Sequence, residues 1–247
     1  MDSFQTMKEP AIPWRHEMKY LISDMEAEVL KKRLSFLMPL DPHAGAKGGY
    51  FIRSLYFDDE KGSALEEKDA GVFYRKKYRI RIYDLSRGII SLERKRKEGA
   101  YIQKASARLT EEEYRKLLHG DCRFLLERRE RVCTDFYADL ISLRMHPVII
   151  VDYDRVPFIC EAGTVRITFD SHVRAAAPSE EIFDGNLPAY EVLDPGTQIL
   201  EVKYTEYLPG EIRCLLQIGS SVQISASKYV LCLEKRRRMI SAEQAVY

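Results

Sequence analysis

The 247-residue sequence has little of what marks a secreted, membrane-spanning or disulfide-stabilised protein. Its 5 cysteines are scattered, odd in number and never spaced as CxxC, which argues against a disulfide framework or a zinc site. Apolar runs such as Pro147–Val151 are far too short to span a bilayer. The start of the chain, MDSFQTMKEP, has no basic segment followed by an apolar one, so we expect no signal peptide. These absences favour a cytoplasmic protein with reduced thiols.

An excess of charge of one sign is also missing. The 39 lysines and arginines nearly balance the 38 aspartates and glutamates, which leaves a net charge of +1. Proteins that coat nucleic acids have a large excess of positive charge, and acidic tails have a large excess of negative charge. We therefore expect no nucleic-acid partner. Hydrophobic residues make up 45% of the chain and charged residues 31%, so the chain can bury a core while carrying many charges. The arrangement of those charges is therefore informative.

Signatures of several common chemistries are absent. The segment 45–49 (GAKGG) lacks the GK[ST] ending of a phosphate-binding loop and precedes a predicted strand, so we interpret it as a turn. His16-Glu17 is not followed by a second histidine at the spacing of a zinc peptidase. The other histidines are isolated, and no GxSxG motif occurs.

No repeat, low-complexity segment or Pro/Gly/Ser-rich linker divides the chain, so we expect one domain with a core from about residue 14 to 238. Alternating patterns predict strands at 14–21, 50–57, 73–83, 89–96, 100–109, 148–160, 163–170, 189–192 and 198–205. Helical spacing predicts helices at 24–37 with Asp24 as its cap, at 60–68, after the capping box Thr110–Glu113, and at 124–144, 208–219 and 227–238. Short connections favour antiparallel pairing, so we predict an α+β fold dominated by one sheet of about eight strands.

The predicted strand from 73 to 83 separates charged from apolar side chains. Successive side chains of a strand point to opposite faces, so odd positions form one face and even positions the other. The odd positions are Arg75, Lys77, Arg79 and Arg81, and the even ones include Tyr74, Tyr78, Ile80 and Ile82. One face is therefore cationic and the other largely apolar.

The same separation recurs on other predicted strands. The charged sets are Arg15, Glu17 and Lys19; Arg53; Glu93, Lys95 and Lys97; Tyr153 and Arg155; Arg166, Thr168 and Asp170; and Glu201 and Lys203. A two-layer sheet with its charged face in water would explain any one of these strands. Rows of cations on many strands instead favour a sheet closed into a barrel, with the charged faces inside.

A cationic tunnel of this kind suits a phosphate-rich ligand. Guanidinium groups pair bidentately with phosphate oxygens, and glutamates among the cations can hold a divalent metal that bridges the phosphates. We therefore predict an antiparallel eight-stranded β-barrel tunnel with helices packed outside. Arg15 and Lys77 are among the side chains expected to bind phosphate.

Eight motifs in order resemble the VTC domain, the polyphosphate polymerase domain of the vacuolar transporter chaperone complex. That family belongs to the triphosphate tunnel metalloenzymes, which are related to the CYTH phosphatases. The resemblance covers residues 15 to about 230, and this chain is similar to a stand-alone form. The motifs are RHEMKY (15–20), RSLYFDD (53–59), KYRIRIY (77–83), LERKRK (92–97), VDYDRVPF (151–158), VRITFD (165–170), LEVKY (200–204) and SASKY (225–229).

The resemblance implies a tunnel that binds the triphosphate of ATP and transfers its γ-phosphate to polyphosphate with Mn²⁺ or Mg²⁺. Glu201 is similar to the metal-binding glutamate of the family, with Glu17 and Glu93 as further candidate ligands. Lys228 matches a lysine that points to the transferred phosphate. The expected phosphate-binding residues are Lys19, Arg79, Arg81, Lys95, Lys104, Arg155, Arg166 and Lys203, with Tyr153 lining the tunnel.

Some features depart from the wider family and leave alternatives open. CYTH members usually begin with ExExK, whereas this chain has Arg15-x-Glu17-x-Lys19, which favours the VTC branch and removes one candidate metal ligand. The chain has neither an SPX domain nor membrane helices, so coupling of synthesis to translocation would need a separate membrane protein as partner. The alternatives are an inorganic or nucleoside triphosphatase, with water as the acceptor, and a non-catalytic module that binds polyphosphate or nucleotide.

Overall fold

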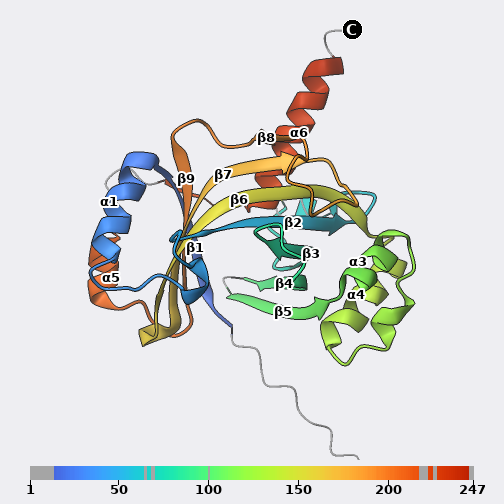
Figure 1. The fold of residues 1–247 in the computed structure, drawn as a ribbon, viewed down its shortest axis with the longest axis horizontal. Coiled ribbons are helices and arrows are strands. Elements are labelled where there is room, and N and C mark those ends of the chain that lie inside the picture. The colour runs from blue at the N-terminus through green and yellow to red at the C-terminus, as the bar shows by residue number, and fades with distance from the viewer. Residues whose placement is uncertain are drawn as a thin grey trace, which may run out of the picture.

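The computed structural model describes residues 14–63, 66–67, 70–99, 101–216, 222–224 and 227–244. Its centre is a 10-stranded antiparallel sheet in the order β10-β1-β9-β7-β6-β2-β3-β4-β5, with β8 paired to β7 (Figure 1). The strands are β1 (His16–Ser23), β2 (Tyr50–Asp58), β3 (Tyr74–Tyr83), β4 (Ile90–Glu98), β5 (Tyr101–Leu109), β6 (His146–Cys160), β7 (Val165–Ala176), β8 (Ala189–Glu191), β9 (Thr197–Tyr204) and β10 (Val222–Gln223).

Helices pack against this sheet. They are α1 (Asp24–Leu34), α3 (Glu111–Leu118), α4 (Arg131–Ser142), α5 (Gly210–Leu215) and α6 (Lys228–Gln244). In Figure 1, α1 and α5 lie at the left end of the curved sheet, α3 and α4 lie at its right end, and α6 begins at the sheet and projects away from it. No helix among the described residues is long and apolar enough to cross a membrane.

Most predicted elements are confirmed, with changes at their ends. Helix α1 starts at a capping box in which Ser23 accepts a hydrogen bond from the Glu26 amide, so the expected cap Asp24 is instead its first residue. The segment 124–144 contains a short 3₁₀ turn at Arg123–Leu126 and then α4, which begins only at Arg131. The predicted helices at 60–68 and 208–219 lie partly outside the described residues.

The apolar strand faces pack under the helices in three clusters. The even-numbered side chains of β3, including Tyr78 and Ile80, pack against α3 and α4. The outward faces of β1, β7 and β9 pack against α1 and α5, and parts of β2 and β6 pack against α6. The first two clusters lie on the outer face of the sheet, whereas the third, which includes Tyr56 and Tyr153, lies on the inner face under α6. Beyond this third cluster the charged faces point inward, as the alternation predicted.

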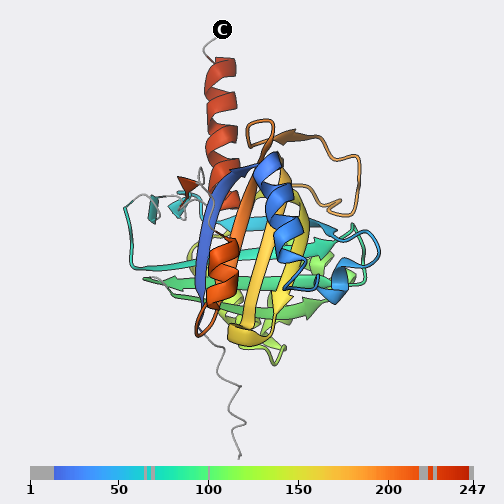
Figure 2. The same ribbon diagram turned by 90° about the vertical axis from the view of Figure 1, so that its left-hand side faces the viewer.

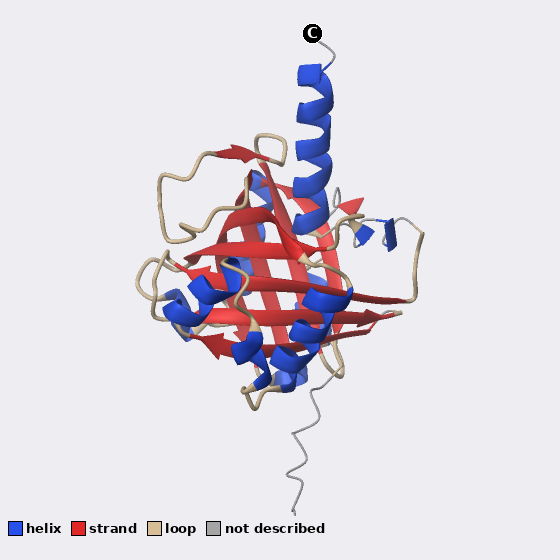
Figure 3. Cartoon of the chain, turned by 90° about the vertical axis from the view of Figure 1, so that its right-hand side faces the viewer, coloured by secondary structure: helices blue, strands red, loops and turns tan. Residues whose placement is uncertain are grey.

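The prediction of a closed eight-stranded barrel is wrong. The edge strands β1 and β5 meet only at one isolated bridge, in which Arg15 and Ile102 exchange two backbone hydrogen bonds of 3.1 Å. Further along β1, the edge facing away from β9 is occupied by β10, which pairs with Tyr20 and Leu21. Strands β1 and β9 also run across the direction of β4 and β5, as Figure 2 shows, so a ladder between β1 and β5 cannot continue. The result is a strongly curved sheet with a concave inner face, seen from the other side in Figure 3.

Candidate functional site

The inner face of the sheet and the start of α6 enclose a cavity of about 70 Å³. Its lining includes three carboxylates, Glu17, Glu93 and Glu201. It also includes ten cationic side chains: Arg15, Lys19, Lys77, Arg79, Arg81, Lys95, Lys104, Arg155, Lys203 and Lys228. The large excess of cations makes the cavity a candidate anion-binding site, which we call the central cavity.

Strand register brings these side chains together from distant parts of the sequence. On β1 and β9, Glu17 lies opposite Lys203, and Lys19 lies opposite Glu201. On β3 and β4, Arg79 lies opposite Glu93. Each of these pairs places opposite charges directly across a ladder, which favours the observed register.

Glu17 is held between two lysines. Its carboxylate accepts hydrogen bonds of 2.7 and 2.9 Å from Lys95 and forms an ion pair of 3.0 Å with Lys19. Burial alone would raise the pKa of Glu17, but Lys95 and Lys19 outweigh this effect and hold the pKa well below its usual range. Glu17 therefore remains ionised inside the protein.

Glu201 connects β9 to the first residue of α6. Its two oxygens accept hydrogen bonds from Lys203 at 2.6 Å and from Lys228 at 3.0 Å. Lys228 is only 7% exposed. Burial opposes its charge, but Asp170 and Glu201 raise the pKa of Lys228 above its usual value, so this lysine enters the cavity as a cation.

Asp170 binds two of the cations that also contact Glu201, and it was not predicted as a site residue. It is fully buried on β7, and Arg155 binds it through two hydrogen bonds of 2.6 and 2.8 Å. Lys228 forms a second ion pair with it. Asp170 shares strand parity with Arg166, but the alternation alone does not show which cations it meets.

Glu93 organises a second group of cations, apart from Glu17 and Glu201. It accepts a hydrogen bond of 2.8 Å from Arg79 and forms an ion pair of 2.6 Å with Lys104. Burial acts to raise the pKa of Glu93, but Arg79 and Arg81 overcome it, and the pKa lies far below its usual value. Arg81 is oriented by Ser54 at 3.1 Å and by the hydroxyl of Tyr153 at 2.8 Å.

Three lysines of the cavity are poised to change charge near neutral pH. Burial lowers the pKa of Lys95 to about 7 despite the nearby Glu17. Burial also lowers the pKa of Lys104 and that of Lys203 to about 8, against the opposing effect of Glu93 and Glu201. A bound polyanion would favour their protonated forms.

Of the predicted phosphate-binding residues, only Arg166 lies away from the central cavity. It lies in an adjoining chamber of about 720 Å³, where it forms an ion pair of 2.6 Å with Asp41 and donates to the Tyr50 hydroxyl at 2.9 Å. Arg79, Arg81, Glu93 and Arg155 are among the residues that line both spaces, so the chamber continues from the central cavity.

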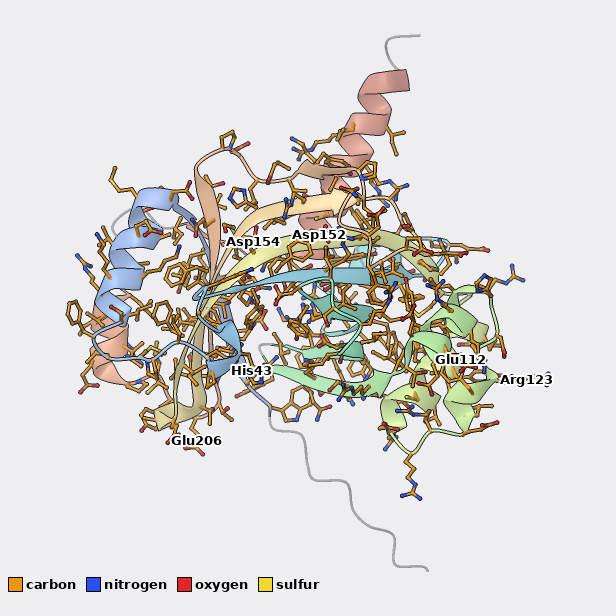
Figure 4. All side chains as sticks on the ribbon, viewed as in Figure 1. His43, Glu112, Arg123, Asp152, Asp154 and Glu206 are labelled. Atoms are coloured by element: carbon orange, nitrogen blue, oxygen red, sulfur yellow. The ribbon has the colours of Figure 1, made fainter. Side chains whose placement is uncertain are left out.

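Arg53, which the alternation grouped with the charged faces, does not reach the cavity. It lies on the outer face of β2, 2% exposed, and binds Asp152 of β6 (labelled in Figure 4) through hydrogen bonds of 2.8 to 3.2 Å. It also donates to the carbonyl of Ile182 at 3.0 Å. On this strand it is instead Tyr56 that reaches the cavity, where its hydroxyl accepts a hydrogen bond of 2.7 Å from Arg79.

The three glutamates predicted as metal ligands do not form one set. Within the described ranges, no three His, Cys, Asp or Glu side chains gather as a metal site. Glu17 and Glu201 are diagonal neighbours on β1 and β9, within reach of a common ion, whereas Glu93 is bound by Arg79 and Lys104. Two carboxylates fit Mn²⁺ or Mg²⁺ because such ions in nucleotide sites take their remaining ligands from phosphates and water.

Residues 14–236 match the VTC domain. The chain belongs to the VTC domain family. No curated protein matches the sequence.

Among solved structures, this VTC domain is similar to one bacterial and one archaeal protein. A candidate adenylate cyclase from Bacillus halodurans is 14% identical, with 92% of this chain and 91% of that chain covered and a TM-score of 0.43. The PH1819 protein from Pyrococcus horikoshii OT3 is 15% identical, with 90% and 99% covered and a TM-score of 0.46.

Proposed function

We propose that this VTC domain is a metal-dependent polyphosphate polymerase that transfers the γ-phosphate of ATP to a polyphosphate chain. The observation that carries the proposal is the composition of the central cavity. Ten cationic side chains face three carboxylates there, an excess larger than the charge of about four on a single nucleoside triphosphate. The remaining cations can neutralise a second phosphate chain, which a polymerase must bind as acceptor.

The two groups of cations suggest a division of roles. Arg79, Arg81 and Lys104 continue into the 720 Å³ chamber, which has room for a nucleoside. These three would bind the phosphates that stay with the nucleoside. Lys19, Lys95 and Lys228 bind Glu17 or Glu201 and would hold the transferred phosphate. Transfer between two phosphates requires chiefly that charge is neutralised and that the reacting atoms are aligned.

Glu201, with Glu17, would hold Mn²⁺ or Mg²⁺, which would offset the charge that develops on the leaving oxygen. The cations that these carboxylates now bind would move to phosphate oxygens of the substrate, since phosphate and carboxylate compete for the same donors. Lys228 remains charged and buried, so its ammonium group can bind the phosphate while it is transferred. The acceptor is a terminal phosphate that is already anionic at neutral pH, so no general base is needed.

A triphosphatase would use the same residues with water as the acceptor. The excess of cations over one triphosphate favours the polymerase, because water brings no additional charge into the cavity. A module that only binds polyphosphate or nucleotide would need neither Glu201 nor the buried, charged Lys228 that donates a hydrogen bond to it.

The experiment that tests the proposal is incubation of the purified protein with γ-labelled ATP and Mn²⁺, followed by separation of the products by size. We expect the label in a ladder of long chains. Label only in orthophosphate would replace the polymerase by a phosphatase. Absence of turnover, together with binding of ATP or polyphosphate, would instead identify a binding module.

A further inference from the structure

The cationic inner face of β3 and β4 extends beyond the central cavity. Arg75 and Lys97 lie directly opposite each other, one pair further out than Lys77 and Lys95. All four have the strand parity of Arg79, whose side chain lines the cavity. The face therefore continues for at least one more cross-strand pair.

This outermost pair, like the Lys77–Lys95 pair next to it, places two like charges across a ladder, an arrangement that destabilises a sheet. The outward-facing cations of the same strands have acidic partners: Lys76 lies 2.6 Å from Asp139, and Arg94 is paired with Asp135. Among the described residues, neither Arg75 nor Lys97 forms an ion pair. The arrangement suggests that an external anion serves as their partner.

The surroundings of the pair support this reading. The Nε of Arg75 is buried and has no hydrogen-bond partner among the described residues. Burial, followed by repulsion from Arg75 and Lys19, lowers the pKa of Lys97. Glu67 is close enough for its pKa to be affected by Arg75, but it lies outside ion-pair distance. A bound anion would relieve both the repulsion and the unsatisfied donor.

The pair marks one particular end of the cavity. Next to it, Lys77 donates to Ser227 at 3.4 Å and lies 4.8 Å from the ring centre of Tyr229, so α6 begins at this end. The 720 Å³ chamber lies at the opposite end of β3, around Tyr83 and Asp84. Inner-face residues recur along β3 at intervals of roughly 6.6 Å. Such a row of cations can bind a linear ligand that carries negative charges along its length.

We propose that Arg75 and Lys97 form an outer subsite that binds the polyphosphate chain beyond the reacting phosphates, at the α6 end of the cavity. The inference rests on the proposed function, because it takes polyphosphate as a ligand of the same site. The central cavity, of about 70 Å³, suits an unbranched phosphate chain, whereas the 720 Å³ chamber at the other end has room for the bulkier nucleoside. The subsite distinguishes long chains, which extend past the cavity, from tripolyphosphate, which the ten cations of the central cavity can hold without it.

Calorimetric titration with tripolyphosphate and with polyphosphate of about a hundred units tests the subsite. The variant is Arg75→Gln combined with Lys97→Gln, and the control is Lys32→Gln combined with Arg33→Gln. The control removes the same charge from exposed positions at the end of α1. Thermal melting checks folding, and we expect the Arg75/Lys97 variant to be as stable as the wild type, because the like-charge pair is gone.

For the Arg75/Lys97 variant, we expect about tenfold weaker binding of the long chain and unchanged binding of tripolyphosphate. The salt dependence of long-chain binding should fall by roughly the equivalent of two counterions. Equal losses for both ligands, losses shared with the control, or no loss would overturn the subsite. If the wild type binds neither ligand, the proposed function fails, and that result is distinct from a wild type that binds both with no effect of the variant.

Discussion

At the scale of single residues, buried carboxylates set the charge and geometry of the central cavity. The side chains of Glu17, Glu93, Glu201 and Asp170 are each at least nine-tenths buried and each bind two or more cations. Buried cations without such partners would be strongly destabilising. The carboxylates therefore keep the arginines and lysines folded inward until a phosphate ligand takes over some of their hydrogen bonds.

The depressed pKa of Lys95 predicts a pH-dependent affinity for anions. Lysines bind phosphate when protonated, and the free site loses these protons as the pH rises through about 7 for Lys95 and about 8 for Lys104 and Lys203. Affinity for tripolyphosphate should therefore fall, by at least about tenfold, between pH 7 and 9. The last ionisation of a terminal phosphate lies lower, at about 6, and does not mask the effect.

Calorimetry in buffers of different ionisation enthalpy measures the predicted proton uptake directly. We expect uptake on binding at pH 8 in the wild type and less uptake in Lys95→Met. Affinity that stays constant from pH 7 to 9 without proton uptake would show that these lysines are already fully charged in the free protein.

Replacement of Glu201 separates binding from turnover. In Glu201→Gln, repulsion of the ligand decreases, so tripolyphosphate should bind at least as well as to the wild type. Turnover should fall by about 100-fold or more, because the amide is a poor metal ligand. Binding and γ-phosphate transfer are measured on the same preparation, and full activity would remove Glu201 from the metal site.

The alternation of side chains predicted most of these residues, because parity depends only on neighbouring positions of one strand. It predicted the inward faces of β1, β3, β4 and β9. It did not predict the cavity role of Tyr56 or the outward position of Arg53, because the RSLYF segment carries polar and apolar residues at both parities. Asp170 was missed as a site residue because strand parity gives neither the register that places Arg155 opposite it nor the position of Lys228 on α6.

At the scale of elements, α6 connects the two sides of the cavity. Its first residue, Lys228, reaches Asp170 of β7 and Glu201 of β9. Its second residue, Tyr229, donates a hydrogen bond of 2.6 Å to Asp58 at the end of β2, and its ring lies 4.8 Å from that of Tyr56. The start of the helix is therefore fixed from both sides.

Removal of the Tyr229 hydroxyl should loosen the start of α6. Tyr229→Phe leaves the buried Asp58 carboxylate without this donor, and we expect a loss of about 1–3 kcal/mol in unfolding free energy. Faster hydrogen exchange should be concentrated in the first turns of the helix. Tyr190→Phe is the matched control, because the Tyr190 hydroxyl is buried without a hydrogen-bond partner among the described residues. Equal destabilisation by both changes would contradict the anchoring role.

Helices were predicted best where capping residues in the sequence mark their first turn. The capping box Thr110–Glu113 marked α3 correctly. For α1, Ser23 and Asp24 are both good caps, and the reciprocal bonds with Glu26 favour Ser23. The two-residue strand β10 depends on pairing with β1 and has too short a pattern to be predicted.

At the scale of the whole molecule, strand alternation indicated a charged interior but not whether the sheet closes. Alternation is the same in a closed barrel and in a curved open sheet, whereas closure depends on register between edges far apart in sequence. Here β10 and the crossing of β1 over β5 end the ladder after the Arg15–Ile102 bridge. The inner face nevertheless surrounds the central cavity, since residues of β1 to β6, β9 and α6 line it.

The proposed function requires that this inner face is an enclosed phosphate site and not a solvated charged surface. Titration of tripolyphosphate into the wild type and Arg81→Ala tests it most directly, because Arg81 is only 5% exposed and lies in both the cavity and the chamber. Loss of its charge-assisted hydrogen bonds should weaken binding by about tenfold or more, with the fold retained in thermal melting. Unchanged affinity in the folded variant would show that tripolyphosphate does not bind inside the sheet.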